Sequence, residues 1–244
     1  PTQVDPVIQP LAQDARIVPL PSREAGGRRH SPTAAWGSQP PLLIIALGET
    51  ARSANFSLNG YPRPTNPKLQ SLPVLSYRQV TSCGTSTAAS LPCMFSHLGR
   101  EGHDTRTAEY ENLLDVLQRA GYQVLWIDNQ SGCKGLCDRI PAVRTSQLSL
   151  QSSECTQGEC MDAVLLPVLK ERLQSLNAQP SSELPHKIGT VVVLHMMGSH
   201  GPAYFKRSRP PHQPFQPTCN SIVLSDCSPQ QILNAYDNSL VYTD

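Results

Sequence analysis

The chain has 244 residues, of which 16% are charged and 39% are hydrophobic, and its formal net charge is +1. This balance excludes a disordered tail and a chain that lies mostly within a membrane. It also argues against nucleic acid as the main partner, because binding to phosphates needs a concentrated positive field. A chain of this length can form one large domain or two small ones.

Residues 1–41 carry many prolines and show no regular spacing of apolar residues, so we expect a proline-rich linker or extended segment there. The run LLIIAL at 42–47 is the longest apolar stretch, far short of the ~20 residues that cross a bilayer. It predicts a buried, central strand that leads into a loop beginning with Gly48 and Glu49. The first residue is Pro1 and no signal peptide is recognisable. We therefore expect a processed piece of a longer protein.

Helical and strand patterns alternate along the rest of the chain. Apolar residues at helical spacing predict helices over 112–121, 159–177 and 229–244. Two further apolar runs, within 122–130 and 188–202, predict strands that end in polar residues. This α/β alternation builds a mostly parallel sheet, whose functional crevice lies beyond the carboxyl ends of the strands.

The polar residues that follow the three predicted strands define a candidate rim of the sheet. They are Glu49 and Thr50, then Asp128 to Ser131 with Lys134, and then His195 and His200. Because the loop between the first two strands can reach the same edge, its hydroxyl groups can join this rim. The simpler alternatives stay open, since each histidine could be a core-edge imidazole and the lysine an ordinary surface residue.

The eight cysteines occur as close neighbours in the chain. The four pairs are Cys83 with Cys93, Cys133 with Cys137, Cys155 with Cys160, and Cys219 with Cys227. We expect four local disulfides, and therefore an oxidising compartment. Zinc binding is the competing interpretation, but only the second pair approaches the spacing of a zinc finger, and no matching pair with histidines follows it.

The first cysteine pair encloses a loop of small residues that includes Thr85, Ser86, Thr87 and Ser90. A threonine is a poor nucleophile unless a base or a metal removes its proton. A zinc ion held by Glu49 could do this, since zinc strongly lowers the pKa of a bound oxygen. The simpler alternatives are a glutamate that caps a helix, and hydroxyl residues that form a turn or an N-cap.

Five blocks of the sequence carry a family resemblance. They are GETARSANFSLNGYPRPTNP, TSCGTSTAASLPCMFS, ENLLDVLQRAGYQVLWIDNQSGCKG, HMMGSHGPAYFKR and YDNSLVYTD. In this order they resemble the periplasmic catalytic domain of lipid A phosphoethanolamine transferases, the group that includes the mobile colistin-resistance enzymes. The resemblance implies that residues 42–244 form a catalytic domain of the alkaline-phosphatase and sulfatase type. Its fold is an α/β structure with a mostly parallel sheet sandwiched by helices and with local disulfides.

The resemblance also implies roles for individual residues. Thr87 corresponds to the nucleophile that carries phosphoethanolamine covalently, and Glu49 and Thr87 correspond to ligands of a zinc ion. His200 corresponds to a histidine of the substrate or second-metal region, and Gln130 stands where relatives often have asparagine. The candidate substrate-binding residues are Gln130, Ser131, Lys134, His195 and His200.

The activity that the resemblance implies is zinc-dependent transfer of phosphoethanolamine from phosphatidylethanolamine to a lipid A phosphate. It would occur at the periplasmic face of the bacterial inner membrane, where a membrane domain of several helices precedes the family's catalytic domain. The modification lowers negative surface charge and gives resistance to polymyxin and colistin. The family completes its zinc site with an Asp-His pair in a segment like DHGESLGE, which this sequence lacks. We therefore expect the remaining ligands beyond residue 244, and weak zinc binding by these residues alone.

Two other functions remain in competition. The first is a hydrolase of the same superfamily, that is a phosphatase, sulfatase or phosphodiesterase, which uses water as the acceptor and releases phosphoethanolamine without lipid A. The second is a folded module without catalysis, in which the rim residues are ordinary polar groups of loops. Such a module would gain no mass on Thr87 after exposure to the donor lipid.

Overall fold

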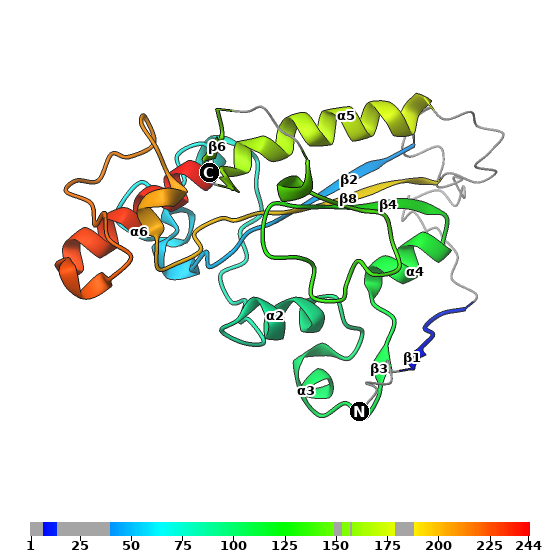
Figure 1. The fold of residues 1–244 in the computed structure, drawn as a ribbon. Helices are drawn as coiled ribbons and strands as arrows, with labels where there is room; N and C mark the ends of the chain where they lie inside the picture. Colours follow the sequence, from blue (N-terminus) through cyan, green and yellow to red (C-terminus); the bar gives the residue numbers. More distant parts are fainter. Residues whose placement is uncertain (1–6, 14–39, 149–152, 157, 179–187) are drawn as a thin grey trace, which may run out of the picture.

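The computed structural model describes residues 7–13, 40–148, 153–156, 158–178 and 188–244 (Figure 1). Most of the predicted N-terminal linker lies outside these ranges. Where it is described, β1 (Ile8–Gln9) pairs in parallel with β3 (Glu109–Tyr110). The backbone N–H of Leu11 also donates to the Glu111 carboxylate at 2.7 Å. This short stretch is therefore docked on the domain, and the expectation of a linker or extended segment stays a prediction for the rest of residues 1–41.

The other elements follow the predicted α/β alternation. The strands are β2 (Leu42–Leu47), β4 (Tyr122–Asp128), β5 (Ala142–Arg144), β6 (Cys155–Thr156), β7 (Glu159–Cys160) and β8 (Gly189–His195). The α-helices are α2 (Thr87–Met94), α3 (Gly99–Asp104), α4 (Leu113–Arg119), α5 (Leu165–Ala178) and α6 (Pro229–Thr243). None of the helices in the described part is long and apolar enough to cross a membrane.

The predicted helices over 112–121 and 229–244 are confirmed as α4 and α6. The helix predicted over 159–177 begins later, at Leu165, because β6 and β7 form an antiparallel hairpin before it. Pro167 fits α5 because it is the third residue of the helix, where a backbone N–H would have no partner inside the helix.

Four parallel strands form the main sheet in the order β2-β8-β4-β5. Their register aligns the strand ends, because Leu47 of β2 and Asp128 of β4 both lie opposite His195 of β8. The residues that follow these three strands therefore emerge at one edge, as the alternation predicted.

Helices cover both faces of this sheet (Figure 1). On one face, Leu165 and Val168 of α5 belong to a buried cluster with Ile127 and Val192. On the other face, α2 and α4 contribute to a second cluster around Trp126. Every residue of β8 is buried, as expected for a central strand whose side chains point alternately into two cores.

The prediction that 42–47 is a central, buried strand is wrong for the described part of the chain. β2 is the edge of the sheet and pairs only with β8. The side chains of Leu42, Leu43 and Ile44 are 43–53% exposed, whereas Leu47, next to the site, is buried. A continuous apolar run shows that a strand has two apolar faces, but it does not say whether both edges of that strand are paired.

All four predicted disulfides are present, and no cysteine is free. Replacing Cys83 and Cys93 by serine removes a link that spans ten residues. We expect the free energy of unfolding to fall by about 2–3 kcal/mol, because the unfolded chain gains the freedom of this loop. Denaturant unfolding under non-reducing conditions measures this.

The matched control for this variant is the replacement of Cys219 and Cys227 by serine. This pair closes a loop of similar size, with a separation of eight residues. Both double variants should lose similar stability, and only the first should also lose the transfer activity that the family resemblance implies, since its loop carries Thr87. Equal activities for the two variants would contradict a role of the first disulfide in holding the site.

Candidate active site

The centre of the candidate site is a contact between Glu49 and Thr87. Glu49 lies two residues beyond β2, and Thr87 is the first residue of α2. Ser86 caps this helix, since its hydroxyl accepts a hydrogen bond from the N–H of Ala89 at 3.3 Å. Thr87 Oγ1 donates to Glu49 Oε2 at 2.7 Å. The two residues that sequence reasoning assigned to one metal ion therefore touch each other, although 38 positions separate them.

The Glu49 carboxylate has two further contacts, both neutral. Thr50 Oγ1 donates to Oε1 at 2.8 Å, and Gln130 Nε2 approaches Oε2 at 3.4 Å. No Lys or Arg in the described ranges forms an ion pair with Glu49. Glu49 and Thr87 are both half-buried. A partly desolvated carboxylate without a basic partner is a favourable place for a cation.

The donor set fits part of a zinc site. A carboxylate oxygen and a threonine oxygen in direct contact can bind one divalent ion, and zinc accepts oxygen ligands in a four-coordinate site. Another group of potential ligands in the described part consists of Cys133, Cys137 and Asp138. Its two sulfurs are bonded to each other, so they cannot act as thiolate ligands.

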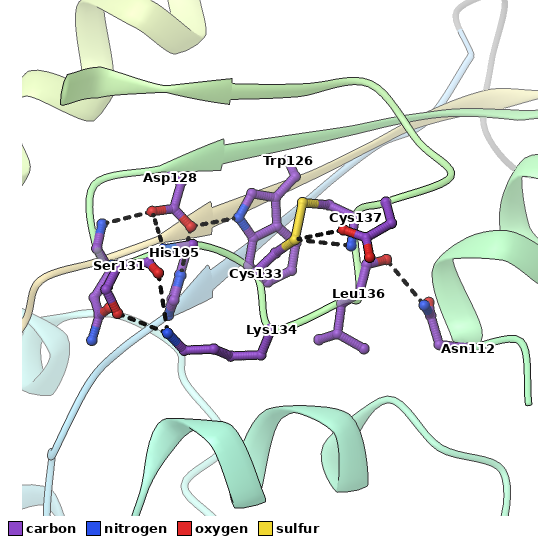
Figure 2. The surroundings of a disulfide bond; sticks show 12 residues. Asn112, Trp126, Asp128, Ser131, Cys133, Lys134, Leu136, Cys137 and His195 are labelled. Atoms are coloured by element: carbon purple, nitrogen blue, oxygen red, sulfur yellow. Dashed lines mark hydrogen bonds and ion pairs between the residues drawn. A yellow bond between two sulfur atoms is a disulfide. The ribbon is translucent and has the colours of Figure 1, made fainter. Parts of the chain in front are cut away.

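The loop after β4 is held by the buried carboxylate of Asp128. Its Oδ1 accepts hydrogen bonds from the N–H groups of Gln130 and Gly132 at 3.0 and 3.1 Å. Its Oδ2 accepts from Trp126 Nε1 and pairs with His195 Nδ1, each at 2.9 Å (Figure 2). Burial by itself raises the pKa of Asp128, but the hydrogen bonds from His195 and Trp126 outweigh it and lower the pKa to about 2.

The expectation that His195 contacts substrate does not agree with its position. The residue is 1% exposed, its ring packs edge-on against Trp126, and its Nδ1 is bonded to Asp128. It is the last residue of β8, and its side chain is buried beside Trp126 of the neighbouring strand β4. His195 therefore supports the loop that follows β4 and is not itself on the rim.

Lys134 remains a candidate for binding a phosphate. Its Nζ donates to the backbone oxygen and the hydroxyl of Ser131 at 3.1 and 2.9 Å (Figure 2), and no carboxylate of the described residues pairs with it. The Cys133–Cys137 disulfide fixes the base of this loop, and Asn112 Nδ2 donates to the carbonyl of Leu136 at 3.0 Å. The ammonium group of Lys134 is therefore held beside Ser131, and no carboxylate in the described part of the chain neutralises its charge.

His200 lies on a turn that packs against the backbone of Glu49. Ser199 N–H donates to the Glu49 carbonyl at 3.0 Å. Gly198 has φ +52°, and a Cβ there would lie 2.7 Å from Glu49 N, so only glycine fits this approach. The His200 side chain is half-buried. The structure therefore brings the turn of His200, but not the ring of His195, to the rim.

Sequence reasoning missed Asp162, which holds the same turn. Its carboxylate accepts hydrogen bonds from the N–H groups of Met197 and Gly198, each at 2.7 Å, and from Asn129 Nδ2 at 2.8 Å. It thereby joins the loops that follow β4 and β8. No pattern in the sequence indicated this role, because the acceptor and its donors are more than 30 positions apart.

The lowered pKa of Asp128 predicts a specific pH dependence of stability. Because its pKa falls from 3.8 to about 2 on folding, this carboxylate stabilises the protein above about pH 4. Acidification from about pH 5 to about pH 2 removes about 2 kcal/mol of this stabilisation. The Asp128→Asn variant lacks it. We expect the gap in free energy of unfolding between wild type and variant to shrink by that amount in denaturant titrations, and a constant gap would contradict the assignment.

Comparisons with known proteins test the family resemblance and the fold. The family model described as Sulfatase matches residues 41–244. Phosphoethanolamine transferase EptA of Salmonella typhimurium is 42% identical over 231 residues, which are 94% of this chain and 40% of that protein. The chain therefore spans about 40% of the length of this curated relative. The resemblance found in the sequence is confirmed.

Two solved structures share the fold. The soluble domain of lipooligosaccharide phosphoethanolamine transferase A from Neisseria meningitidis is 41% identical, with a TM-score of 0.76 over 85% of this chain and 60% of that one. The C-terminal periplasmic domain of EptC from Escherichia coli, solved in complex with zinc, is 23% identical, with a TM-score of 0.61 over 84% of this chain and 57% of that one. The second likeness shows the fold alone. The predicted sulfatase-like α/β fold is confirmed.

Proposed function

Because the chain belongs to the sulfatase family, we propose that it is the catalytic part of a phosphoethanolamine transferase, with Thr87 as the group that carries the phosphoethanolamine. The observation that supports this proposal most is the 2.7 Å hydrogen bond from Thr87 Oγ1 to Glu49 Oε2. It puts a hydroxyl beside an acceptor for its proton, at the sheet edge where this class of fold places its sites.

The proposed reaction has two displacements at phosphorus. Thr87 Oγ1 attacks the phosphorus of phosphatidylethanolamine and its proton passes to Glu49. The bond to the diacylglycerol oxygen breaks, and this oxygen takes up the proton from Glu49, so that diacylglycerol leaves as a neutral alcohol. A phosphate oxygen of lipid A then attacks the phosphothreonine, the bond to Thr87 Oγ1 breaks, and the proton of the attacking phosphate passes to Thr87 Oγ1, which restores the hydroxyl. A zinc ion held by Glu49 and Thr87 would supply positive charge that lowers the pKa of the hydroxyl.

The surrounding residues would stabilise the charge on the phosphoryl oxygens. Thr87 begins α2, and the first N–H groups of a helix have no partner within it, so they suit a phosphate. Lys134 carries an ammonium group without a carboxylate partner and belongs to the loop of Gln130 and Ser131. His200 lies on the turn next to Glu49. Gln130, Ser131, Lys134 and His200 would bind and orient the donor headgroup.

The partners and location follow from the same proposal. The donor is phosphatidylethanolamine and the acceptor is a lipid A phosphate, so the site would work at the periplasmic face of the inner membrane, next to a transmembrane part of the whole protein. Transfer of the headgroup would reduce the negative charge of lipid A and with it the binding of polymyxin and colistin.

The identity of the acceptor, lipid A or water, distinguishes a transferase from a hydrolase. We expect the full-length protein to convert a fluorescent phosphatidylethanolamine to diacylglycerol with many turnovers only when lipid A is present, and to label lipid A with phosphoethanolamine. Sustained release of free phosphoethanolamine without lipid A would instead identify a hydrolase. No reaction with either lipid would leave the folded module as the better description.

A further inference from the structure

The helix α6 buries a run of polar residues in an unusual arrangement. Tyr236, Asp237, Asn238 and Ser239 follow one another and are 6, 0, 0 and 0% exposed. Buried polar groups need hydrogen-bond partners, and each of these residues finds them in a part of the chain that lies far away in the sequence. α6 therefore fixes several loops at once, and two of these loops belong to the candidate site.

Tyr236 bonds to the turn that follows Glu49. Its hydroxyl donates to the carbonyl of Thr50 at 2.8 Å and accepts from the N–H of Arg52 at 2.9 Å. Thr50 has φ +54°, a left-handed conformation that is unfavourable for a β-branched residue and needs support from its surroundings. The Tyr236 hydroxyl supplies this support, because it bonds to both the first and the last residue of the Thr50–Arg52 turn.

The next residue of α6 holds the chain segment that follows this turn. Asp237 accepts hydrogen bonds from Asn55 and Tyr61 at 3.0 and 2.8 Å and pairs with Arg63 at 2.6 Å. These contacts fix the chain beyond Thr50. Of the two residues, Tyr236 is therefore the one whose hydrogen bonds lie next to Glu49 in the sequence.

The same helix also reaches the turn of His200. The Ser239 and Ser199 hydroxyls are joined by a 2.8 Å hydrogen bond, and Ser199 N–H donates to the Glu49 carbonyl. The Tyr204 ring packs edge-on against Tyr236 with centroids 5.3 Å apart. The buried residues of α6 therefore contact both the turn that follows Glu49 and the turn that is bonded to the Glu49 carbonyl.

We propose that Tyr236 is a positioning residue for Glu49, whose hydroxyl fixes the Thr50–Arg52 turn and thereby aims the Glu49 carboxylate at Thr87. Tyr236 is bonded to the backbone of this turn and not to either reacting side chain. The inference rests on the proposed function only in taking Glu49 as a ligand of the ion. Residues that orient a metal ligand typically change affinity by 10–100-fold when they are lost.

The test compares Tyr236→Phe with Tyr242→Phe in the full-length protein. Both substitutions remove one hydroxyl from α6, but the Tyr242 ring packs edge-on against His212, and in the described part of the chain it is Tyr236 that bonds to the Thr50–Arg52 turn. Zinc affinity is measured by competition with a chromophoric chelator, and transfer is measured at increasing free zinc. We expect about tenfold weaker zinc binding for Tyr236→Phe, with kcat recovering at high zinc, and no change for Tyr242→Phe.

A second pair of variants tests the same interaction by changing the hydrogen-bond donor, the backbone N–H of Arg52. Arg52→Pro removes the N–H that Tyr236 accepts and leaves the tyrosine in place, while Arg52→Ala keeps this N–H. The φ of Arg52 is −88°, close to the range that proline adopts. Only the proline variant should weaken zinc binding, which keeps the test decisive even if Tyr236→Phe does not fold.

The possible results separate the inference from the proposed function. Wild-type zinc affinity in both Tyr236→Phe and Arg52→Pro, with weak binding in Glu49→Gln, would overturn the role of Tyr236 alone. Equal weakening in Tyr236→Phe and Tyr242→Phe would overturn it as well, since it would show a general effect of α6. If wild type and Glu49→Gln bind zinc equally, the metal site of the proposed function fails.

Discussion

Replacing Thr87 by alanine is expected to lower the rate of transfer by at least about 10⁴-fold, because the proposed reaction has no other group to carry the phosphoethanolamine. The hydroxyl is half-buried at the start of α2 and already donates to Glu49. The substitution removes one hydroxyl and one methyl group, so the loop closed by Cys83 and Cys93 should keep its shape. Steady-state transfer to lipid A measures the effect.

Thr85→Ala is the matched control for this variant. Thr85 is the same residue type in the same disulfide-closed loop, but it is exposed and forms no hydrogen bond with the Glu49 side chain in the described part of the chain. It should retain nearly full activity. Substantial transfer by Thr87→Ala, or an equal loss in the two variants, would contradict the assignment of Thr87 as nucleophile.

Replacing Glu49 by glutamine is expected to weaken zinc binding and to lower transfer by at least about 100-fold. Glutamine keeps the size of the side chain and can still contact Thr87, but it removes the negative charge that a divalent cation needs and the acceptor for the threonine proton. The loss should therefore appear in the metal affinity as well as in kcat, with little change in the thermal unfolding temperature.

Glu101→Gln serves as the control for Glu49→Gln. It makes the same substitution at an exposed position of α3 and should leave both zinc affinity and transfer unchanged. Zinc retained against a competing chelator, measured for the three proteins, separates a ligand from a residue that merely adds negative charge. Full zinc affinity in Glu49→Gln would remove Glu49 from the site.

Much of the site could be predicted because its residues follow apolar strands. The strand ends at Leu47, Asp128 and His195 lie at one level in the observed register, so the loops that follow them meet. Glu49 and Thr87 were predicted to lie together and are in contact, while their binding of one ion stays a prediction. Local cysteine spacing also identified all four disulfides.

The parts that could not be predicted depend on contacts between distant residues. Whether His195 faces the rim or the core is decided by Asp128, 67 positions away. The role of Tyr236 depends on a turn 186 positions away, and its place on a helix gives no sign of this. The edge position of β2 follows from the strand order, which an apolar run does not encode.

The most direct measurement is the mass of the peptide that contains Thr87, determined after the full-length protein is incubated with phosphatidylethanolamine and without lipid A. The proposed mechanism predicts an added phosphoethanolamine on Thr87 itself, located by fragmentation, which disappears when lipid A is supplied. An unmodified Thr87 in a protein that goes on to transfer the group to lipid A would contradict it.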